Sequence, residues 1–183
     1  MRVLFAALAV SVGVVAAYSP FVIPSLTTHQ PIGSGSTNFY YVNFEVKSDN
    51  SGKSSSAWCS KSWGDNGWTR LEAYSVNVPT GQWINCDSEE GAYDGNSAFQ
   101  FQLYPYFSIG NFSVSVKQDL GRGSSITAFR SFNNGTSQFT CDINPIEHFP
   151  SQHASGDCGI PAEAGPFRLP VSRARPRGYT PYV

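Results

Sequence analysis

Four cysteines carry the clearest chemistry in this sequence. They stand at Cys59, Cys86, Cys141 and Cys158, without the short Cys-x-x-Cys spacing that structural zinc sites favour. In an exported chain an even number of cysteines indicates disulfide bonds. Four cysteines allow three connectivities, between which the sequence alone does not decide. We predict the sequential pairs, Cys59 with Cys86 and Cys141 with Cys158, and no metal site.

The sequence offers one local cluster of proton-transfer side chains. His148 and His153 lie close to Asp142 and Glu147, and a histidine with a carboxylate suits general acid–base catalysis. The segment is rich in proline and serine and has no periodic pattern that would fix the geometry of these groups. No Gly-x-Ser-x-Gly, phosphate-loop or dinucleotide motif accompanies them. We therefore predict no catalytic residues and no cofactor, although the paired carboxylates of a glycosidase would meet in space and not in sequence.

Two other groups of side chains could bind a ligand. The first is an acidic loop with carboxylates that calcium prefers, but without the order of an EF-hand loop, so we expect a solvated loop; its members are Asp87, Glu89, Glu90 and Asp94. The second is the pair Trp63 and Trp68, which flanks a Gly-Asp-Asn-Gly turn. These rings are predicted to stack on a sugar or a partner protein, or else to pack as lids over the end of the fold.

Export is predicted from the start of the chain. A Met-Arg dipeptide precedes an apolar run that ends in the small residues Val15-Ala16-Ala17. The run is about 15 residues long, too short for a comfortable membrane span but suited to a secretory signal. We predict a signal peptide over residues 1–17, a secreted protein and no membrane span in the mature form; the alternative is an N-terminal anchor. Two sequons fit this route, so we predict glycosylation at Asn111 and Asn134.

The composition favours strands and excludes a nucleic-acid partner. Hydrophobic residues make up 40% of the chain and charged residues 14%, and the net charge is −1, so no basic field attracts a polyanion. Aromatic residues make up 14%, with 17 glycines and 12 prolines, which is typical of strands joined by turns.

Segments that alternate apolar and polar residues predict about eight strands. We expect Pro105 to end one of them or to place it at an edge. The fold class is therefore all-β, a single antiparallel β-barrel or sandwich stapled by disulfides, over residues 38–158. Residues 18–37 are predicted to be a flexible leader or linker, and residues 159–183 a flexible tail rich in proline and arginine. The predicted strands are 38–47, 54–60, 71–78, 82–86, 97–104, 111–117, 125–131 and 138–143.

A series of motifs runs through the predicted domain. In order they are Phe44-x-Val46, Cys59, Trp83-x-x-Cys86, Phe99-x-Phe101-x-Leu103 and Phe139-Thr140-Cys141. This order, over Asn38 to Ile143, resembles that of the secreted fungal proteins typified by the Alternaria major allergen. The Trp83-x-x-Cys86 element is the most telling part of the resemblance.

The resemblance implies a compact antiparallel β-barrel with no known enzymatic core, in proteins that are allergens or that fungal pathogens secrete at the host surface. It also supports a Cys59–Cys86 bridge within the barrel. The allergen carries an additional cysteine near its mature N-terminus that links two chains; this chain has none there, so the oligomeric state stays open. The last cysteine pair of the allergen closes a loop before the final strand, whereas Cys158 follows that strand, so the second bridge is not carried over.

These observations predict a secreted, non-enzymatic β-barrel protein, effector-like or allergen-like, that contacts a host or cell-wall protein or glycan through its surface. One alternative is a carbohydrate-binding or hydrolytic cell-wall protein that uses Trp63 and Trp68. Another is a carrier of a small apolar ligand, which we rank last because large aromatic side chains fill a small barrel.

Overall fold

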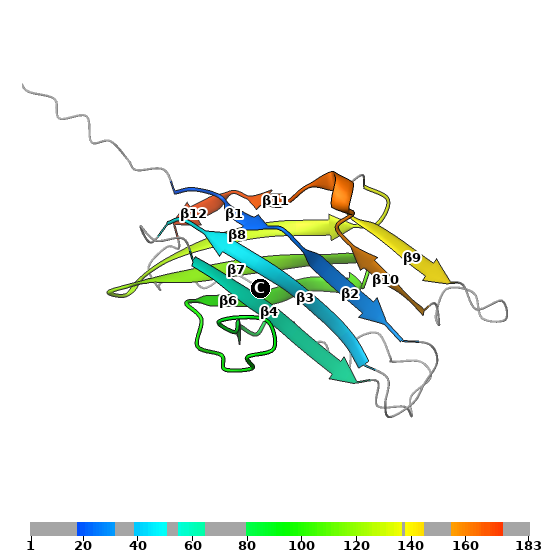
Figure 1. Cartoon of the computed structure of the whole chain (residues 1–183), viewed down its shortest axis with the longest axis horizontal. Helices are drawn as coiled ribbons and strands as arrows, with labels where there is room; N and C mark the ends of the chain where they lie inside the picture. The colour runs from blue at the N-terminus through cyan, green and yellow to red at the C-terminus, as the bar shows by residue number, and fades with distance from the viewer. Residues whose placement is uncertain are drawn as a thin grey trace, which may run out of the picture.

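The protein is a sandwich of two antiparallel β-sheets. The computed structural model describes residues 18–31, 39–50, 55–64, 80–136, 138–144 and 155–173. Figure 1 shows a sheet of seven strands lying in front of a sheet of five. The seven-stranded sheet contains β1 (Phe21–Ile23), β2 (Leu26–Gln30), β3 (Phe39–Ser48), β4 (Ser55–Gly64), β9 (Thr140–Asn144), β10 (Ser155–Gly159) and β11 (Phe167–Leu169). The five-stranded sheet contains β5 (Ile84–Asn85), β6 (Phe99–Ser108), β7 (Asn111–Gly121), β8 (Ser124–Asn133) and β12 (Val171–Arg173).

In both sheets the long strands pair with one another. In the seven-stranded sheet β3 pairs with β4 along its whole length, and its other edge pairs with β2 and, further along, with β1. In the five-stranded sheet the order is β12-β8-β7-β6-β5. A single short 3₁₀ turn, Ala162–Ala164, lies between β10 and β11, and the described residues contain no α-helix. The architecture therefore depends on strand pairing and on packing between the sheets.

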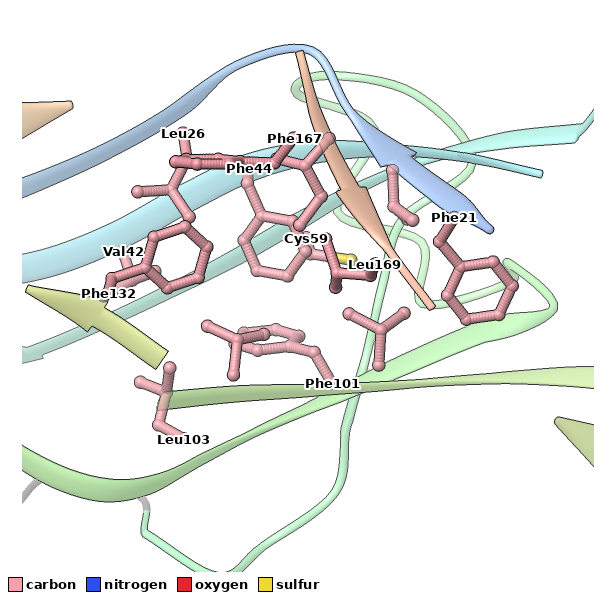
Figure 2. Packing of buried hydrophobic residues seen from close by; sticks show 14 of the residues in the cluster. Phe21, Leu26, Val42, Phe44, Cys59, Phe101, Leu103, Phe132, Phe167 and Leu169 are labelled. Carbon is pink, nitrogen blue, oxygen red and sulfur yellow. The ribbon is translucent and has the colours of Figure 1, made fainter. Parts of the chain in front are cut away.

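The core consists of side chains that alternate toward the space between the sheets. In β6 the inward residues Phe99, Phe101 and Leu103 are at most 1% exposed, and Figure 2 shows such side chains filling the space between the ribbons. Burial of one such ring contributes about 1.5–3 kcal/mol. Four edge-to-face ring pairs join strands of the two sheets: Phe44 with Phe101 at 5.2 Å, Phe21 with Phe99 at 5.8 Å, Phe132 with Phe167 at 5.1 Å and Trp63 with Tyr106 at 5.3 Å.

One buried polar bridge also joins the sheets. Gln118 of β7 is 1% exposed and faces the core. Its amide oxygen accepts a hydrogen bond from the Ser48 hydroxyl (2.7 Å), and its amide nitrogen donates to Ser55 Oγ (3.1 Å). Both serines belong to the opposite sheet, at the ends of β3 and β4 that face each other. The bridge satisfies an amide whose burial without partners would be costly.

The two sheets are joined at both of their sides. On one side the chain leaves the seven-stranded sheet at the end of β11, passes Pro170 and enters the five-stranded sheet as β12, which pairs with β8. On the other side Trp58 of β4 exchanges two backbone hydrogen bonds with Asp87, just after β5. The Cys59–Cys86 disulfide lies beside this bridge. Short strands and a disulfide thus cover edges that would otherwise invite pairing with another chain.

The all-β, disulfide-stapled fold class is confirmed. Of the two predicted architectures the structure is the sandwich; the closed barrel that the resemblance implies is not detected in the described residues. The predicted strand 71–78 lies outside the described residues, as does the predicted signal peptide. Pro105 does not end its strand: β6 continues to Ser108 because the proline occupies a bulge between Leu103 and Tyr106, where no ladder donor is needed.

The predicted leader and tail are wrong in part. Residues 21–30 of the expected leader form β1 and β2, and residues 167–173 of the expected tail form β11 and β12. Each of β1, β11 and β12 has three residues, too few to display a period of two, and Pro24 and Pro170 interrupt the sequence pattern. The domain therefore extends beyond residues 38–158 on both sides.

We expect removal of either disulfide to destabilise the sandwich measurably. The cysteines of the two pairs are 27 and 17 residues apart, and loop entropy gives each bridge about 3 kcal/mol. The Cys59→Ala/Cys86→Ala variant should lose at least this free energy of unfolding in urea, because it also opens the buried join between the sheets. A loss below about 1 kcal/mol would contradict the stapling role of this bridge.

Candidate functional site

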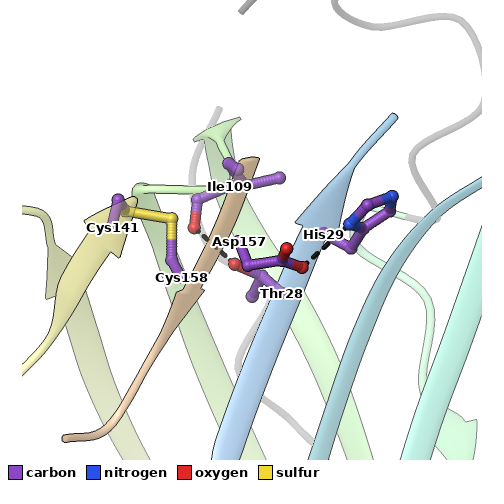
Figure 3. Close-up of polar contacts among 6 residues, drawn as sticks. All are labelled: Thr28, His29, Ile109, Cys141, Asp157 and Cys158. Atoms are coloured by element: carbon purple, nitrogen blue, oxygen red, sulfur yellow. Dashed lines mark hydrogen bonds and ion pairs between the residues drawn. A yellow bond between two sulfur atoms is a disulfide. The ribbon is translucent and has the colours of Figure 1, made fainter. Parts of the chain in front are cut away.

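Both predicted disulfides are confirmed. Cys59–Cys86 connects β4 to the segment after β5, and Cys141–Cys158 connects directly opposite residues of β9 and β10. The second bridge also touches the turn between β6 and β7, where a Cβ added to Gly110 would lie 2.9 Å from Cys141 Sγ. Figure 3 shows the neighbouring contact, in which the buried Thr28 hydroxyl donates to the Ile109 carbonyl (3.0 Å). Cys59–Cys86 therefore has a structural role at a join between the sheets, and Cys141–Cys158 has one within the seven-stranded sheet, beside the β6–β7 turn.

The two sequon asparagines lie at one end of the sandwich. Asn111 begins β7 and Asn134 follows β8, and the ladder places Asn111 opposite Asn133. Both side chains are exposed. Asn134 Oδ1 accepts a hydrogen bond from the Cys141 amide (3.1 Å), which leaves its Nδ2, the atom that carries a glycan, unused by this contact. Their glycosylation remains a prediction.

The predicted ligand contact of Trp63 does not fit the structure, and the alternative prediction, that this ring packs within the fold, holds for it. Its side chain is 8% exposed and stacks on Tyr40 (6.0 Å between centroids), with Tyr106 edge-on at 5.3 Å. Burial raises the pKa of Tyr106, and the nearby Tyr40 adds to the effect. Trp63 faces inward because β4 runs on to Gly64, so it continues the inward alternation of Cys59. Trp68 lies outside the described residues.

The acidic loop is ordered by hydrogen bonds between its own residues. Asp94 accepts hydrogen bonds from the Ser88 amide (3.0 Å), the Ser88 hydroxyl (2.7 Å) and the Asn96 amide (3.1 Å). These bonds, that of the Ser88 hydroxyl first, lower the pKa of Asp94. Asp87 accepts from the Gly95 amide (2.8 Å). Two of the four carboxylates thus order the loop, and the described residues contain no group of three or more His, Cys, Asp or Glu side chains placed to hold a metal ion.

The described residues place one histidine beside a carboxylate. His29 Nδ1 lies 2.8 Å from Asp157 Oδ1 on the outer face of the seven-stranded sheet (Figure 3), and its ring stacks on Tyr41 at 5.1 Å. Burial, and then the charge of Asp157, raises the pKa of Tyr41. Within the described residues, no hydroxyl or thiol lies within hydrogen-bond distance of this imidazole. Of the predicted proton-transfer cluster, Asp142 lies opposite Asp157, and residues 147–153 are outside the described part of the chain.

The outer face of the five-stranded sheet carries rows of polar side chains with exposed aromatic rings among them. The strand register sets polar residues in rows across it: Asn85 opposite Gln100 and Gln100 opposite Lys117, then Gln102 opposite Ser115. Exposed aromatic side chains lie among these rows: Trp83 (40% exposed), Tyr104 (64%) and Phe129 (55%). We call this surface the polar aromatic face. Large aromatic rings among small polar residues are typical of contact surfaces.

A groove of about 590 Å³ crosses one end of the polar aromatic face. Its floor includes Asn85, Gln100 and Lys117, one wall is the 95–98 loop, and the other is the turn between β7 and β8. The Lys117 ammonium reaches out of the groove to lie 4.7 Å from the centre of the Trp83 ring. The volume falls within the ~300–1,000 Å³ of small-molecule sites. This groove is the candidate binding site.

Comparison with family models, curated proteins and solved structures gives no match. The likeness to the fungal allergen family therefore stays a prediction from the motifs. Among the described residues no helix has the length and apolar character to cross a membrane.

We expect tryptophan truncations to separate the core from the surface. Trp63→Ala should lower the free energy of unfolding by about 3–5 kcal/mol, because it empties a buried aromatic site. Trp83→Ala should lower it by about 1 kcal/mol or less, since the ring is 40% exposed. Urea denaturation followed by circular dichroism measures both values. Equal losses would contradict the assignment of Trp63 to the core.

We expect the acidic loop to lose its order only in acid. The pKa of Asp94 in the folded protein is below its ordinary value of 3.8. The carboxylate therefore stabilises the loop fully at pH values above 3.8. Its contribution to stability is lost as the pH falls through the lowered pKa of the folded protein. The amide resonances of Ser88 and Asn96 should shift with a midpoint below 3.8, and Asp94→Asn should abolish this transition. A midpoint above the ordinary value would contradict the bracing role.

Proposed function

We propose that the chain is a secreted, non-enzymatic binding protein, effector-like or allergen-like, that contacts a host or cell-wall component through the polar aromatic face. The signal-like N-terminus and the two sequons support secretion. Two disulfides with no free cysteine among the four support an oxidising compartment. The motifs that resemble those of the fungal family support the idea that the protein is secreted at a host surface.

The observation that carries this proposal is the composition of the polar aromatic face. An outer sheet face usually stays soluble through charged side chains, yet here Lys117 and Asp119 stand among serines, threonines and amides. Trp83, Tyr104 and Phe129 expose 40–64% of their surface on the same side. Exposed rings on a rigid sheet lose little conformational freedom when they bind a partner. A binding role explains why these rings lie outside the core.

A steric variant tests the proposal. Ser115 lies in the middle of the polar aromatic face, between Gln102 and Phe129 in the ladder, so Ser115→Arg should block a partner. Thr27→Arg is the matched control, because Thr27 is an exposed strand residue of the other sheet. Purified protein should bind saturably to cell-wall material or host extracellular proteins, and Ser115→Arg should weaken the binding about tenfold or more.

Unchanged binding by Ser115→Arg, or equal losses in both variants, would contradict the use of this face. Saturable binding to neither type of material would contradict the proposed function itself. Circular dichroism of each variant confirms that the sandwich is intact before binding is measured.

A further inference from the structure

We infer that the groove on the polar aromatic face binds an uncharged oligosaccharide, with Trp83 as the aromatic surface at its side. The inference rests on the proposed function and names the ligand class of that surface. It depends on the amides of the floor, the bracing of the walls, the balance of charge and the position of the indole ring.

The floor presents paired donors and acceptors. Gln100 Nε2 donates to Asn85 Oδ1 at 2.7 Å, across adjacent strands. This bond fixes both amides, so that Gln100 Oε1 remains as an acceptor and Asn85 Nδ2 as a donor, neither with a partner in the described chain. A sugar hydroxyl both donates and accepts. Two neighbouring hydroxyls of one sugar ring therefore match this acceptor and donor.

The walls are held in place before any ligand arrives. Asp94 and Asp87 brace the first wall through the bonds to Ser88, Asn96 and Gly95. Gly95 packs beside Asn85, since an added Cβ would be in ordinary van der Waals contact with the Asn85 Cβ, at 3.6 Å. In the second wall Asp119 Oδ1 accepts from the Gly121 amide (2.7 Å) and fixes the turn. A braced groove avoids the ordering cost that weakens flexible sites.

The charge of the groove favours a neutral ligand. Its lining includes one cation, Lys117, and one anion, Asp119. They lie two residues apart on the same side of β7, so neither a phosphate nor an ammonium ligand would meet a field of one sign. The Lys117 ammonium is already placed over the Trp83 ring. Hydroxyl groups, which take part in hydrogen bonds with both charges, suit this lining better than ions.

The indole ring supplies the apolar part of the site. Trp83 directly precedes β5, and its ring lies next to the groove through its contact with Lys117. A pyranose has an apolar C–H surface as well as its hydroxyls, and flat aromatic rings accommodate such a surface while their polar N–H stays in water. An aromatic ring beside a few placed polar groups is the usual composition of a ligand site.

Glycan binding tests the inference. The purified, disulfide-intact protein is applied to an array of neutral and acidic oligosaccharides, and the best ligand is titrated while indole fluorescence is followed. We expect neutral glycans to bind, and we expect Trp83→Ala to lower the affinity about tenfold or more. Gln100→Ala should lower it several-fold, and because Gln100 is only half-buried on the outer side of β6, this variant keeps the test valid if Trp83→Ala does not fold.

The chain offers matched controls for both variants. Gln30 has the same amide on β2 of the other sheet, and Phe39 is an exposed ring (53%) on that sheet as well. Gln30→Ala and Phe39→Ala should bind like the parent protein. The inference is overturned if no glycan binds, if only acidic glycans bind, or if Gln100→Ala and Gln30→Ala lose affinity equally. If Ser115→Arg still blocks a protein partner while no glycan binds, the ligand class is wrong and the proposed function stands.

Discussion

The face-to-face packing of the two sheets is the interaction on which the rest of the structure depends. It uses one side of every long strand, and in β6 that side is Phe99, Phe101 and Leu103. Since side chains alternate along a strand, the residues between them, Gln100 and Gln102, must point to solvent. The same alternation in β7 and β8 brings outward residues of three strands into continuous rows. The polar aromatic face is therefore a consequence of the core.

The joins between the sheets connect the core to the candidate site. Cys86 is held to Cys59, and Asp87 is held to the Trp58 backbone, so the chain next to Asn85 is fixed covalently and by hydrogen bonds. Asn85 is part of the groove floor. The bridge that closes one side of the sandwich thus also sets the position of an amide in the candidate site. A site built on such a strand is positioned more accurately than one built on a free loop.

Strands β3, β6 and β7 could be predicted from the sequence because each carries three or four apolar residues in strict alternation. They predicted an antiparallel barrel or sandwich, of which the structure is the sandwich, and both predicted disulfides are present. The three-residue strands β1, β11 and β12 could not be predicted, since the prolines beside them read as breaks although they mark places where the chain bends or changes sheet. The groove could not be predicted either, because Asn85, Gln100 and Lys117 meet only through the register of three strands. The residue type alone also gave no way to tell that Trp63 is buried and that Trp83 is half-exposed.

The positions of the two sequons are compatible with a ligand in the groove. Asn111 begins β7, and Lys117 in the groove floor is six residues further along the same strand, about 20 Å away at the rise of an extended chain. Asn134 is at the same end of the sandwich as Asn111, because Asn111 pairs with Asn133. A glycan on either asparagine would therefore cover the end with the β6–β7 turn and leave the β7–β8 turn open. Modification and recognition can occur together on one small sandwich because its longest strand separates them.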